Sequence, residues 1–384
     1  MTAFSLEPEQ IAWCATLREL AERRLRPLAE KGEPGRVNRP LVAALGELGL
    51  IARLFEAGAL DLCLLRESLA RHCTEAETAL ALQGLGAHPV AAHGTAEQRD
   101  RWLPEVTAGR AVAAFALSEP EAGSDAAALA LRAAPDGTGW RLTGEKRWIS
   151  NAPEADLITV FARTTPGAGA RGITAFLVPA DRPGLTGARL DMLSPHPIGS
   201  LFFDGVPVGP GDVLGEVDHG FAVALGTLDR FRPSVGAFAV GMAQAALDAA
   251  LAHTATRTAF GGPLKDLQAV SHQVAEMAVR TEAARLLVYA AATAYDAGEP
   301  GVRRRAAMAK LLATETAQWV VDTAVQLHGA RALRRGHLLE HLYREVRAPR
   351  IYEGASEVQR TIIARELYAE AAAVPVPVPE GGTA

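Results

Sequence analysis

The sequence predicts an α+β multidomain protein in which an all-β middle domain separates two helical domains. Up to about residue 110, apolar residues recur with the period of a helix, and this pattern returns after residue 218 in longer, Ala-rich segments. Between them, short alternating segments are divided by Gly, Pro and Asp turns. Too few helical segments lie between these strands for a parallel βαβ sheet. We therefore expect domains at 1–110, 111–218 and 219–371, and a disordered tail at 372–384.

The first domain opens with a helix predicted over residues 6–25. Four of its apolar residues share one face: Ile11, Leu17, Leu20 and Leu25. Pro27 is expected to end this helix, because proline lacks the N–H of an interior hydrogen bond. Another helix is expected over 41–54. Later in the domain, Thr95 and Gln98 have the spacing of a capping box and predict the start of a further helix.

The middle domain is predicted from alternating segments of high strand propensity. Strands are expected at 111–118, 138–150, 156–164 and 172–180. Asp136-Gly137 indicates a turn before the second of them. Residues 167–172 match the pattern GxGxxG, but a dinucleotide-binding turn needs a strand before it and a helix after it. Here a strand follows, so a hairpin loop is the better interpretation.

The third domain is predicted from long Ala-rich segments with apolar stripes. Its expected helices lie at 221–254, 264–298, 301–328, 337–347 and 356–371. Helices of this length favour an up-and-down bundle. The last residues alternate Pro and Val before turning polar, and this composition predicts the disordered or extended tail.

Composition argues against several classes of protein. Of the 384 residues, 49% are hydrophobic and 22% are charged, and the net charge of -5 argues against a nucleic-acid partner. Cys14, Cys63 and Cys73 form no CxxC pair, so we expect reduced thiols in a cytoplasmic protein, with no disulfide and no metal site. We find no basic leader and no run of about 18 apolar residues, so neither a signal peptide nor a membrane span is expected.

The stretch RIYEGASEVQRTIIARE places one carboxylate, Glu353, in a break before a helix. Gly354 allows the backbone to bend sharply, and Ser356 is expected to cap the helix by accepting a free N–H of its first turn. Taken alone, an acid at this place is more often an ordinary helix-start residue, because carboxylates favour helix N-termini. The alternative, a catalytic carboxylate, depends on the rest of the chain.

Two segments of the middle domain indicate a site for a flat ring. Ser118, Gly123 and Ser124 lie in one irregular loop, where glycine lets backbone approach a ligand and serine offers hydroxyls. Trp148 and Ser150 are expected on one face of a strand, and an indole beside a hydroxyl suits a heteroaromatic ring that needs stacking and an edge hydrogen bond. An ordinary polar turn and a buried core tryptophan are the competing interpretations.

A third segment, RTAFGGPLKDLQ, places Arg257 before a Gly-Gly break and Gln268 on the helix that follows. A guanidinium near a helix start can hold a pyrophosphate. Taken alone, Arg257 is more often a solvated surface charge. His272 has no second histidine three or four residues away, so it is more often a helix-surface residue than a metal ligand.

Seven segments together resemble the acyl-CoA dehydrogenase family, over about residues 6–368. Their order matches the family's order: ALSEPEAGSD, KRWISN, LGTLDRFRPSVG, RTAFGGPLKDLQ, AMAKLLATE, AVQLHGA and IYEGASEVQR. The resemblance implies a helical N-terminal domain, a middle β-barrel domain and a C-terminal four-helix bundle. The residue patterns predict the same three blocks independently.

The resemblance also implies a site. Glu353 matches the catalytic base of most members; a minority carry the base on an earlier helix, where this chain has Phe231, which cannot accept a proton. The residues that match FAD-binding positions are Phe115, Leu117, Ser118, Gly123, Ser124, Trp148, Ser150, Arg257, Phe260, Gln268, Gln326, Gly329, Ala355 and Glu357. The residues that match acyl-CoA-binding positions are Ser124, Asp229, Arg232, Tyr352 and Gly354. In the family, the positions of Arg257, Phe260 and Gln268 hold the FAD of a neighbouring subunit.

The chain departs from the family pattern in three places. The loop usually written HGGxG reads HGARA, where Ala330 adds a methyl group and Arg331 adds a charge near the expected phosphates. Ala355 replaces the usual threonine and removes a hydroxyl donor. The usual PEEYGG loop on the substrate side is absent, and the shorter segment 54–62 stands in its place.

The implied reaction is α,β-dehydrogenation of an acyl-CoA thioester, in which Glu353 removes the α-proton and the β-hydride goes to flavin N5. Family members pass the electrons to an electron-transfer flavoprotein, and the shared FAD contacts imply a homo-oligomer, commonly a tetramer built as two dimers. An acyl-CoA oxidase, a desulfinase and a desaturase of carrier-protein-bound acyl groups are the alternatives within the fold. A non-catalytic helical scaffold is the alternative outside enzymes.

Overall fold

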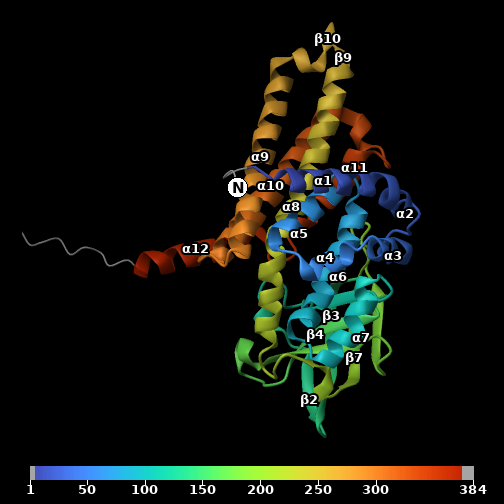
Figure 1. Cartoon of the computed structure of the whole chain (residues 1–384), viewed down its shortest axis with the longest axis vertical. Helices are drawn as coiled ribbons and strands as arrows, with labels where there is room; N and C mark the ends of the chain where they lie inside the picture. The colour runs from blue at the N-terminus through green and yellow to red at the C-terminus, as the bar shows by residue number, and fades with distance from the viewer. Residues whose placement is uncertain (1–4, 374–384) are drawn as a thin grey trace, which may run out of the picture.

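The computed structural model describes residues 5–373 and confirms the predicted order of a helical, a β and a second helical domain. In Figure 1 the β domain forms the lower end of the molecule, and helices of the C-terminal domain form the upper end. The N-terminal helices lie between these two ends. Most of the predicted tail, residues 374–384, lies outside the described residues.

Short helices form the N-terminal domain. They are α1 (Pro8–Leu20), the π turn η1 (Ala21–Leu25), α2 (Arg26–Ala29), α3 (Arg39–Glu47), α4 (Leu50–Glu56), α5 (Ala59–Ala70), α6 (Thr74–His93) and α7 (Ala96–Thr107). The prediction that Pro27 ends the first helix is wrong: Pro27 lies in the first turn of α2, directly after the π turn, where a proline is tolerated. The predicted apolar face is only partly buried, since Leu17 and Leu25 are inaccessible whereas Ile11 is 54% exposed.

Two local signals set helix boundaries in this domain. The helix expected over 41–54 is broken, because Gly49 adopts a left-handed φ of 70° between α3 and α4. The capping box at the start of α7 is confirmed: Thr95 Oγ1 accepts from Gln98 N at 3.2 Å, and Gln98 Oε1 accepts from Thr95 N at 2.8 Å. Both boundaries follow from local chemistry, but the sequence pattern predicted only the second.

The middle domain is an eight-stranded sheet in the order β6-β7-β3-β2-β4-β5-β8, with β1 also paired to β4. Its strands are β1 (Ala113–Ala116), β2 (Arg132–Asp136), β3 (Gly139–Ser150), β4 (Leu157–Arg163), β5 (Ile173–Pro179), β6 (Leu185–Arg189), β7 (Ile198–Val208) and β8 (Val213–Leu214). The four predicted strands correspond to β1, β3, β4 and β5. The GxGxxG segment lies in the antiparallel β4–β5 hairpin, which confirms the hairpin interpretation. Strands β6 and β7 were not predicted, because Gly and Pro interrupt their alternation.

The C-terminal domain contains all five predicted helices. They are α8 (Gly220–Thr256), α9 (Gln268–Asp296), α10 (Val302–His328), α11 (Leu338–Glu345) and α12 (Ser356–Ala373). The short hairpin of β9 (Thr258–Ala259) and β10 (Gly262–Pro263) joins α8 to α9 at the upper tip of Figure 1. Helices α8, α9 and α10 pack together, and α5 packs against α8 and α9. The end of α12 projects from the body of the protein (Figure 1).

The long helix α8 connects two hydrophobic cores. Its first half, including Phe231, packs with the N-terminal helices and the sheet, and its second half, from Ala237 onward, packs with α5, α9 and α10. By length and composition alone, α8 could cross a membrane, although the sequence pattern predicted no such span. However, 72% of its apolar window is buried within the protein, as expected for the central helix of a bundle.

A buried ion pair holds the loop that follows β1. Lys146 on β3 is inaccessible to water and donates to Glu119 Oε1 at 2.7 Å and to the Leu117 carbonyl at 2.9 Å. Glu119 also accepts from the backbone N–H groups of Ala130 and Leu131 at 2.6 and 2.9 Å. Burial lowers the pKa of Lys146 to about 8. One carboxylate therefore fixes both ends of the 119–131 loop.

Replacement Glu119→Gln is expected to lower the free energy of unfolding by about 3–5 kcal/mol, because it leaves the Lys146 ammonium buried without its counter-charge. The matched control is Asp136→Asn, which breaks the half-exposed Arg141–Asp136 pair on the same sheet and should cost less than about 1 kcal/mol. Urea unfolding monitored by circular dichroism measures both. Equal losses in the two variants would contradict a structural role for the buried pair.

Candidate active site

Glu353 lies in a tight turn between a short 3₁₀ turn (Ala348–Arg350) and α12. Its φ of 49° is in the left-handed region, which is uncommon for a residue with a side chain, and Gly354 follows at 90°. Such backbone strain persists only where the surroundings impose it, and it concentrates at functional sites.

The residues after this turn correct one prediction. Ser356 does not cap α12; its hydroxyl donates to Glu315 Oε1 on α10 at 2.6 Å. Ala355 is the N-cap residue of α12, and its carbonyl accepts from Gln359 N at 3.0 Å. The serine therefore ties the start of α12 to α10, and the strained turn is anchored from both sides.

The carboxyl group of Glu353 is buried among positive charges. Its Oε2 atom is inaccessible and has no hydrogen-bond partner. Burial raises the pKa of Glu353, and the charges of Arg66 on α5, Lys310 on α10 and Arg232 on α8 oppose that rise, in this order. A surface acid at a helix start would not have these surroundings. Burial thus favours proton uptake by this carboxyl, and the nearby cations favour its ionised form.

None of these cations pairs with Glu353 directly. Within residues 5–373, no ion pair or side-chain hydrogen bond reaches its carboxylate. Arg66 instead pairs with the buried Glu77 of α6 and donates to Ser234 Oγ at 2.7 Å. The sequence pattern did not single out Arg66, Glu77 or Lys310, because a charged residue in a helical segment gives no signal of its burial.

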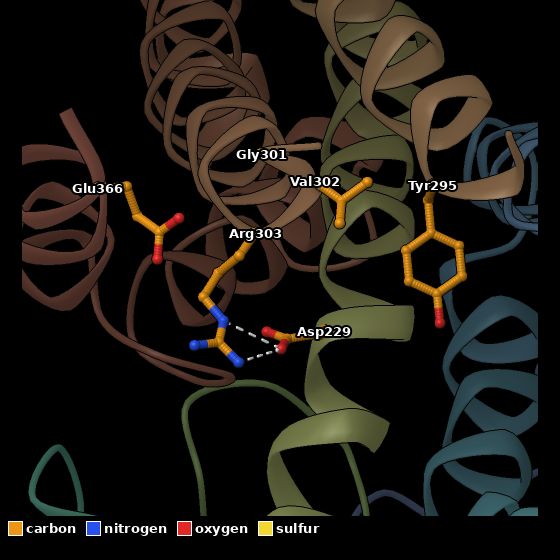
Figure 2. A pocket seen from close by; sticks show the side chains of 6 residues that line it. All are labelled: Asp229, Tyr295, Gly301, Val302, Arg303 and Glu366. Atoms are coloured by element: carbon orange, nitrogen blue, oxygen red, sulfur yellow. Dashed lines mark hydrogen bonds and ion pairs between the residues drawn. The ribbon is translucent and has the colours of Figure 1, made fainter. Parts of the chain in front are cut away.

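Asp229 and Arg232, both predicted to bind substrate, form one charged cluster on α8. Asp229 pairs with Arg232 through one oxygen and accepts from Arg303 of α10 at 3.0 Å through the other. Figure 2 shows Arg303 and Asp229 facing each other beside a pocket. The pocket has a volume of about 250 Å³ and is lined by Asp229, Tyr295, Gly301, Val302, Arg303 and Glu366. A chain of charges thus runs from this pocket through Arg232 toward the base.

Phe231 fills the place where some relatives of the implied family carry a carboxylate. It is 1% exposed, and its ring meets that of His88 edge-on at 5.7 Å. A Cβ on Gly84 would lie 2.7 Å from the Phe231 ring, so glycine is needed there for this packing. Phe231 therefore cannot accept a proton. The acid nearest to it in this turn of α8, Asp229, is already paired with Arg232 and Arg303.

Trp148 and Ser150 lie on β3, where the pairing with β7 shifts register between Lys146 and Ile149. Trp148 has a φ of 63° and is 49% exposed, so it is not a core tryptophan. The Ser150 hydroxyl has no hydrogen-bond partner among the described residues, and neither has that of Ser118, on the loop that the Lys146 pair fixes. The Arg147 guanidinium lies over the Trp148 ring, 5.1 Å from its centroid, and the ring remains half-exposed. A half-exposed indole and free hydroxyls in the same domain fit a flat ring with polar edges.

The remaining residues of the predicted cofactor set fall into two groups. Phe115, Leu117, Gly123, Ser124, Ala355 and Glu357 lie on β1, in the loop after it or beside Glu353. Arg257, Phe260, Gln268, Gln326 and Gly329 are exposed at the other end of the long helices, near the β9–β10 tip, and Phe260 is 93% exposed. A single chain therefore does not bring the two groups together (Figure 1). Tyr352 and Gly354 flank Glu353 as their sequence positions require.

Comparison with known proteins identifies the class. The chain matches three descriptions: "Acyl-CoA dehydrogenase, N-terminal domain" over 7–110, the middle domain over 114–206 and the C-terminal domain over 218–368. These three matches span most of the described residues in the expected order. The chain is an enzyme of the flavin-dependent dehydrogenase class; it belongs to the acyl-CoA dehydrogenase family, whose members are FAD-dependent.

Relatives from distant organisms agree with this assignment. The chain is 38% identical to the probable acyl-CoA dehydrogenase FadE25 of Mycobacterium tuberculosis, covering 95% of this chain and 96% of that protein. It is 39% identical to the mitochondrial short-chain specific acyl-CoA dehydrogenase of Bos taurus, covering 92% and 88%. The solved butyryl-CoA dehydrogenase from Megasphaera elsdenii is 32% identical, with a TM-score of 0.89 and coverage of 95% and 99%.

Replacement Trp148→Ala is expected to weaken FAD binding by about 10-fold or more, because one lost aromatic stacking contact costs about 1–3 kcal/mol. Titration of the apoprotein with FAD, followed by flavin fluorescence, measures this affinity. Trp148→Phe retains an aromatic face and should keep most of it. Unchanged affinity in Trp148→Ala would remove this residue from the cofactor site.

Proposed function

We propose that this protein catalyses the α,β-dehydrogenation of an acyl-CoA thioester, with Glu353 as the base that removes the α-proton. The observation that carries this proposal is the unpaired Glu353 carboxylate, one oxygen of which is inaccessible to water, within the ring of three cations formed by Arg66, Arg232 and Lys310. A general base must be free to reach the proton that it abstracts, and it must titrate near the working pH. The Glu353 carboxylate has no partner to block it, and burial raises its pKa above the usual range of a carboxyl.

The backbone of the same turn offers a second catalytic element. The N–H of Glu353 donates to no described residue, whereas the carbonyl groups of Tyr352, Glu353 and Gly354 all accept hydrogen bonds. Removal of an α-proton develops negative charge on the thioester oxygen, and a fixed N–H donor stabilises that charge. We assign this N–H to the thioester oxygen. The residue that takes the proton would then also orient the carbonyl group that acidifies it.

The cofactor we propose is FAD, bound by residues of the middle domain. The half-exposed indole of Trp148 and the free hydroxyls of Ser118 and Ser150 fit a flavin ring. FAD supplies the acceptor for the β-hydride when it is bound. The exposed residues near the β9–β10 tip, including Arg257 and Phe260, would contact the FAD of a second copy of the chain.

The assembly and the electron acceptor are parts of the same proposal. Because the two groups of cofactor residues lie at opposite ends of the long helices, a complete site requires a homo-oligomer, which we propose is a tetramer of two dimers. We propose an electron-transfer flavoprotein as the electron acceptor and the cytoplasm as the location. The names of the similar proteins include short-chain acyl-CoA and butyryl-CoA dehydrogenases, which supports a thioester of coenzyme A as substrate.

Replacement Glu353→Gln is expected to leave FAD bound and to abolish the bleaching of flavin absorbance when acyl-CoA is added without oxygen. The amide is isosteric with the carboxyl but cannot accept the α-proton. Anaerobic absorbance spectra at about 450 nm, recorded on the order of minutes after mixing, measure the loss. Full bleaching in this variant would exclude Glu353 as the base.

The reaction class can be tested on the wild-type protein. A panel of straight, branched and cyclic acyl-CoA thioesters should be oxidised with an artificial electron acceptor, and little peroxide should form in air. Dominant peroxide release would instead indicate an oxidase. Turnover only with acyl groups on a carrier protein would contradict the coenzyme A substrate, and a colourless protein that binds no flavin would contradict enzymatic function altogether.

A further inference from the structure

Two buried side chains hold the carbonyl groups of the Glu353 turn. Lys310 Nζ donates to the carbonyl of Tyr352 at 3.0 Å and to that of Gly354 at 2.7 Å. Gln359 Nε2 donates to the carbonyl of Glu353 at 3.3 Å and to that of Gly354 at 2.8 Å. All three consecutive carbonyl groups of the turn are therefore fixed by side chains of α10 and α12.

The turn requires such support. A left-handed φ at a glutamate is sparsely populated, so the backbone of Glu353 would relax if nothing held its carbonyl groups. A Cβ on Gly354 would lie 2.4 Å from Gln359 Nε2, so glycine is needed for Gln359 to approach. Lys310 and Gln359, which hold the three carbonyl groups, are called the clamp. The direction of the Glu353 side chain follows from the backbone of this turn, so the clamp sets that direction.

Lys310 is an unfavourable residue for a purely structural clamp. Its side chain is inaccessible to water, and it forms no ion pair with any carboxylate among residues 5–373. Burying an ammonium without a paired carboxylate is strongly destabilising, whereas a neutral donor such as that of Gln359 could bond the same carbonyls with a smaller desolvation penalty. Hydrogen bonding to carbonyl groups alone therefore does not account for a positive charge at Lys310.

The positive charge of Lys310 interacts with the charged groups around it. Glu353, Glu315 and Glu357 favour its charge, and Arg232 opposes it; burial lowers its pKa to about 8, so it stays mainly protonated at neutral pH. Lys310 in turn favours the ionised form of Glu353, together with Arg66 and Arg232. Arg66 is neutralised by Glu77, and Arg232 by Asp229, whereas Lys310 donates its hydrogen bonds to neutral carbonyls. Its charge is the one in the ring without a paired counter-charge.

We propose that Lys310 is a positioning residue for the base: its ammonium clamps the two carbonyl groups that flank Glu353, and its unpaired charge keeps the Glu353 carboxylate ionised. This inference rests on the proposed function, because it gives Lys310 its role through Glu353. It assigns two separable effects to one side chain, the geometry of the turn and the ionisation of the base. Gln359 contributes the first effect only.

Replacement Lys310→Met separates these effects when it is compared with Gln359→Met. Both variants remove clamp donors with little change in volume, but only the first removes a charge. In Lys310→Met the limiting rate of flavin reduction by acyl-CoA should fall about 10-fold or more at neutral pH. When this rate is plotted against pH, the acidic limb of the profile should move up by about one pH unit. Loss of a nearby cation raises the pKa of Glu353, and the base acts only when it is ionised. Gln359→Met should lose rate without moving the limb.

Three controls accompany this comparison. Lys31→Met removes an exposed lysine after α2 and should match the wild type. Flavin content and KM for acyl-CoA should change by less than about threefold in Lys310→Met, since the residue contacts neither ligand in this proposal. In the apoprotein, the carboxyl band that Glu353→Gln abolishes in infrared difference spectra should titrate at higher pH in Lys310→Met, which tests the ionisation effect without cofactor or turnover.

An unchanged acidic limb and an unchanged infrared titration in Lys310→Met would overturn the inference and leave Lys310 as a structural residue, even if its thermal midpoint fell. Should Lys310→Met fail to fold, Lys310→Arg retains the charge with altered clamp geometry: a reduced rate with a wild-type limb supports the inference, and a displaced limb overturns it. Failure of the proposed function is distinguished by Glu353→Gln, which would then retain full flavin bleaching.

Discussion

One carboxylate oxygen of Glu353 is inaccessible to water, the carboxylate has no partner among the described residues, and three cations favour its charge without binding it. Burial raises the pKa of the carboxyl and so favours its protonated form, whereas a direct ion pair would block it. The structure avoids both outcomes because each cation is bonded elsewhere. Arg66 pairs with Glu77, Arg232 pairs with Asp229, and Lys310 bonds to backbone carbonyls. This balance of burial against distant charge supports the proposed role of the carboxyl as a base.

That balance requires three helices to meet at one turn. The cations come from α5 in the N-terminal domain and from α8 and α10 in the C-terminal domain, and the strained turn itself precedes α12. The helix α8 contributes to both hydrophobic cores, so it fixes the domains relative to one another and keeps the ring of charges in register. The middle domain adds the exposed indole of Trp148 on a separate rigid sheet, whose adjoining loop is held by the buried Lys146–Glu119 pair.

Local patterns predicted the architecture well and the details of backbone bends less well. The order of domains, the long helices, the capping box at Thr95 and the hairpin at the GxGxxG segment all followed from periodicity and turn chemistry. Pro27, Gly49 and Ser356 were misjudged. A π turn ahead of Pro27 and a carboxylate from another helix beside Ser356 depend on neighbours that a local pattern does not contain, whereas the left-handed φ at Gly49 is a conformation that glycine permits but does not require.

The sequence by itself determined which residue types are available: a glutamate before a helix, a tryptophan with a nearby serine, and a phenylalanine where a second acid could have stood. These features are local, and Glu353 was singled out only when seven segments along the chain were matched to the family pattern. Only the tertiary structure decided that Arg66, Arg232 and Lys310 surround this carboxylate and that Lys310 has no paired counter-charge. Electrostatic effects act through space between groups up to 287 positions apart (353 less 66), and burial depends on packing, so neither can be read from neighbouring residues.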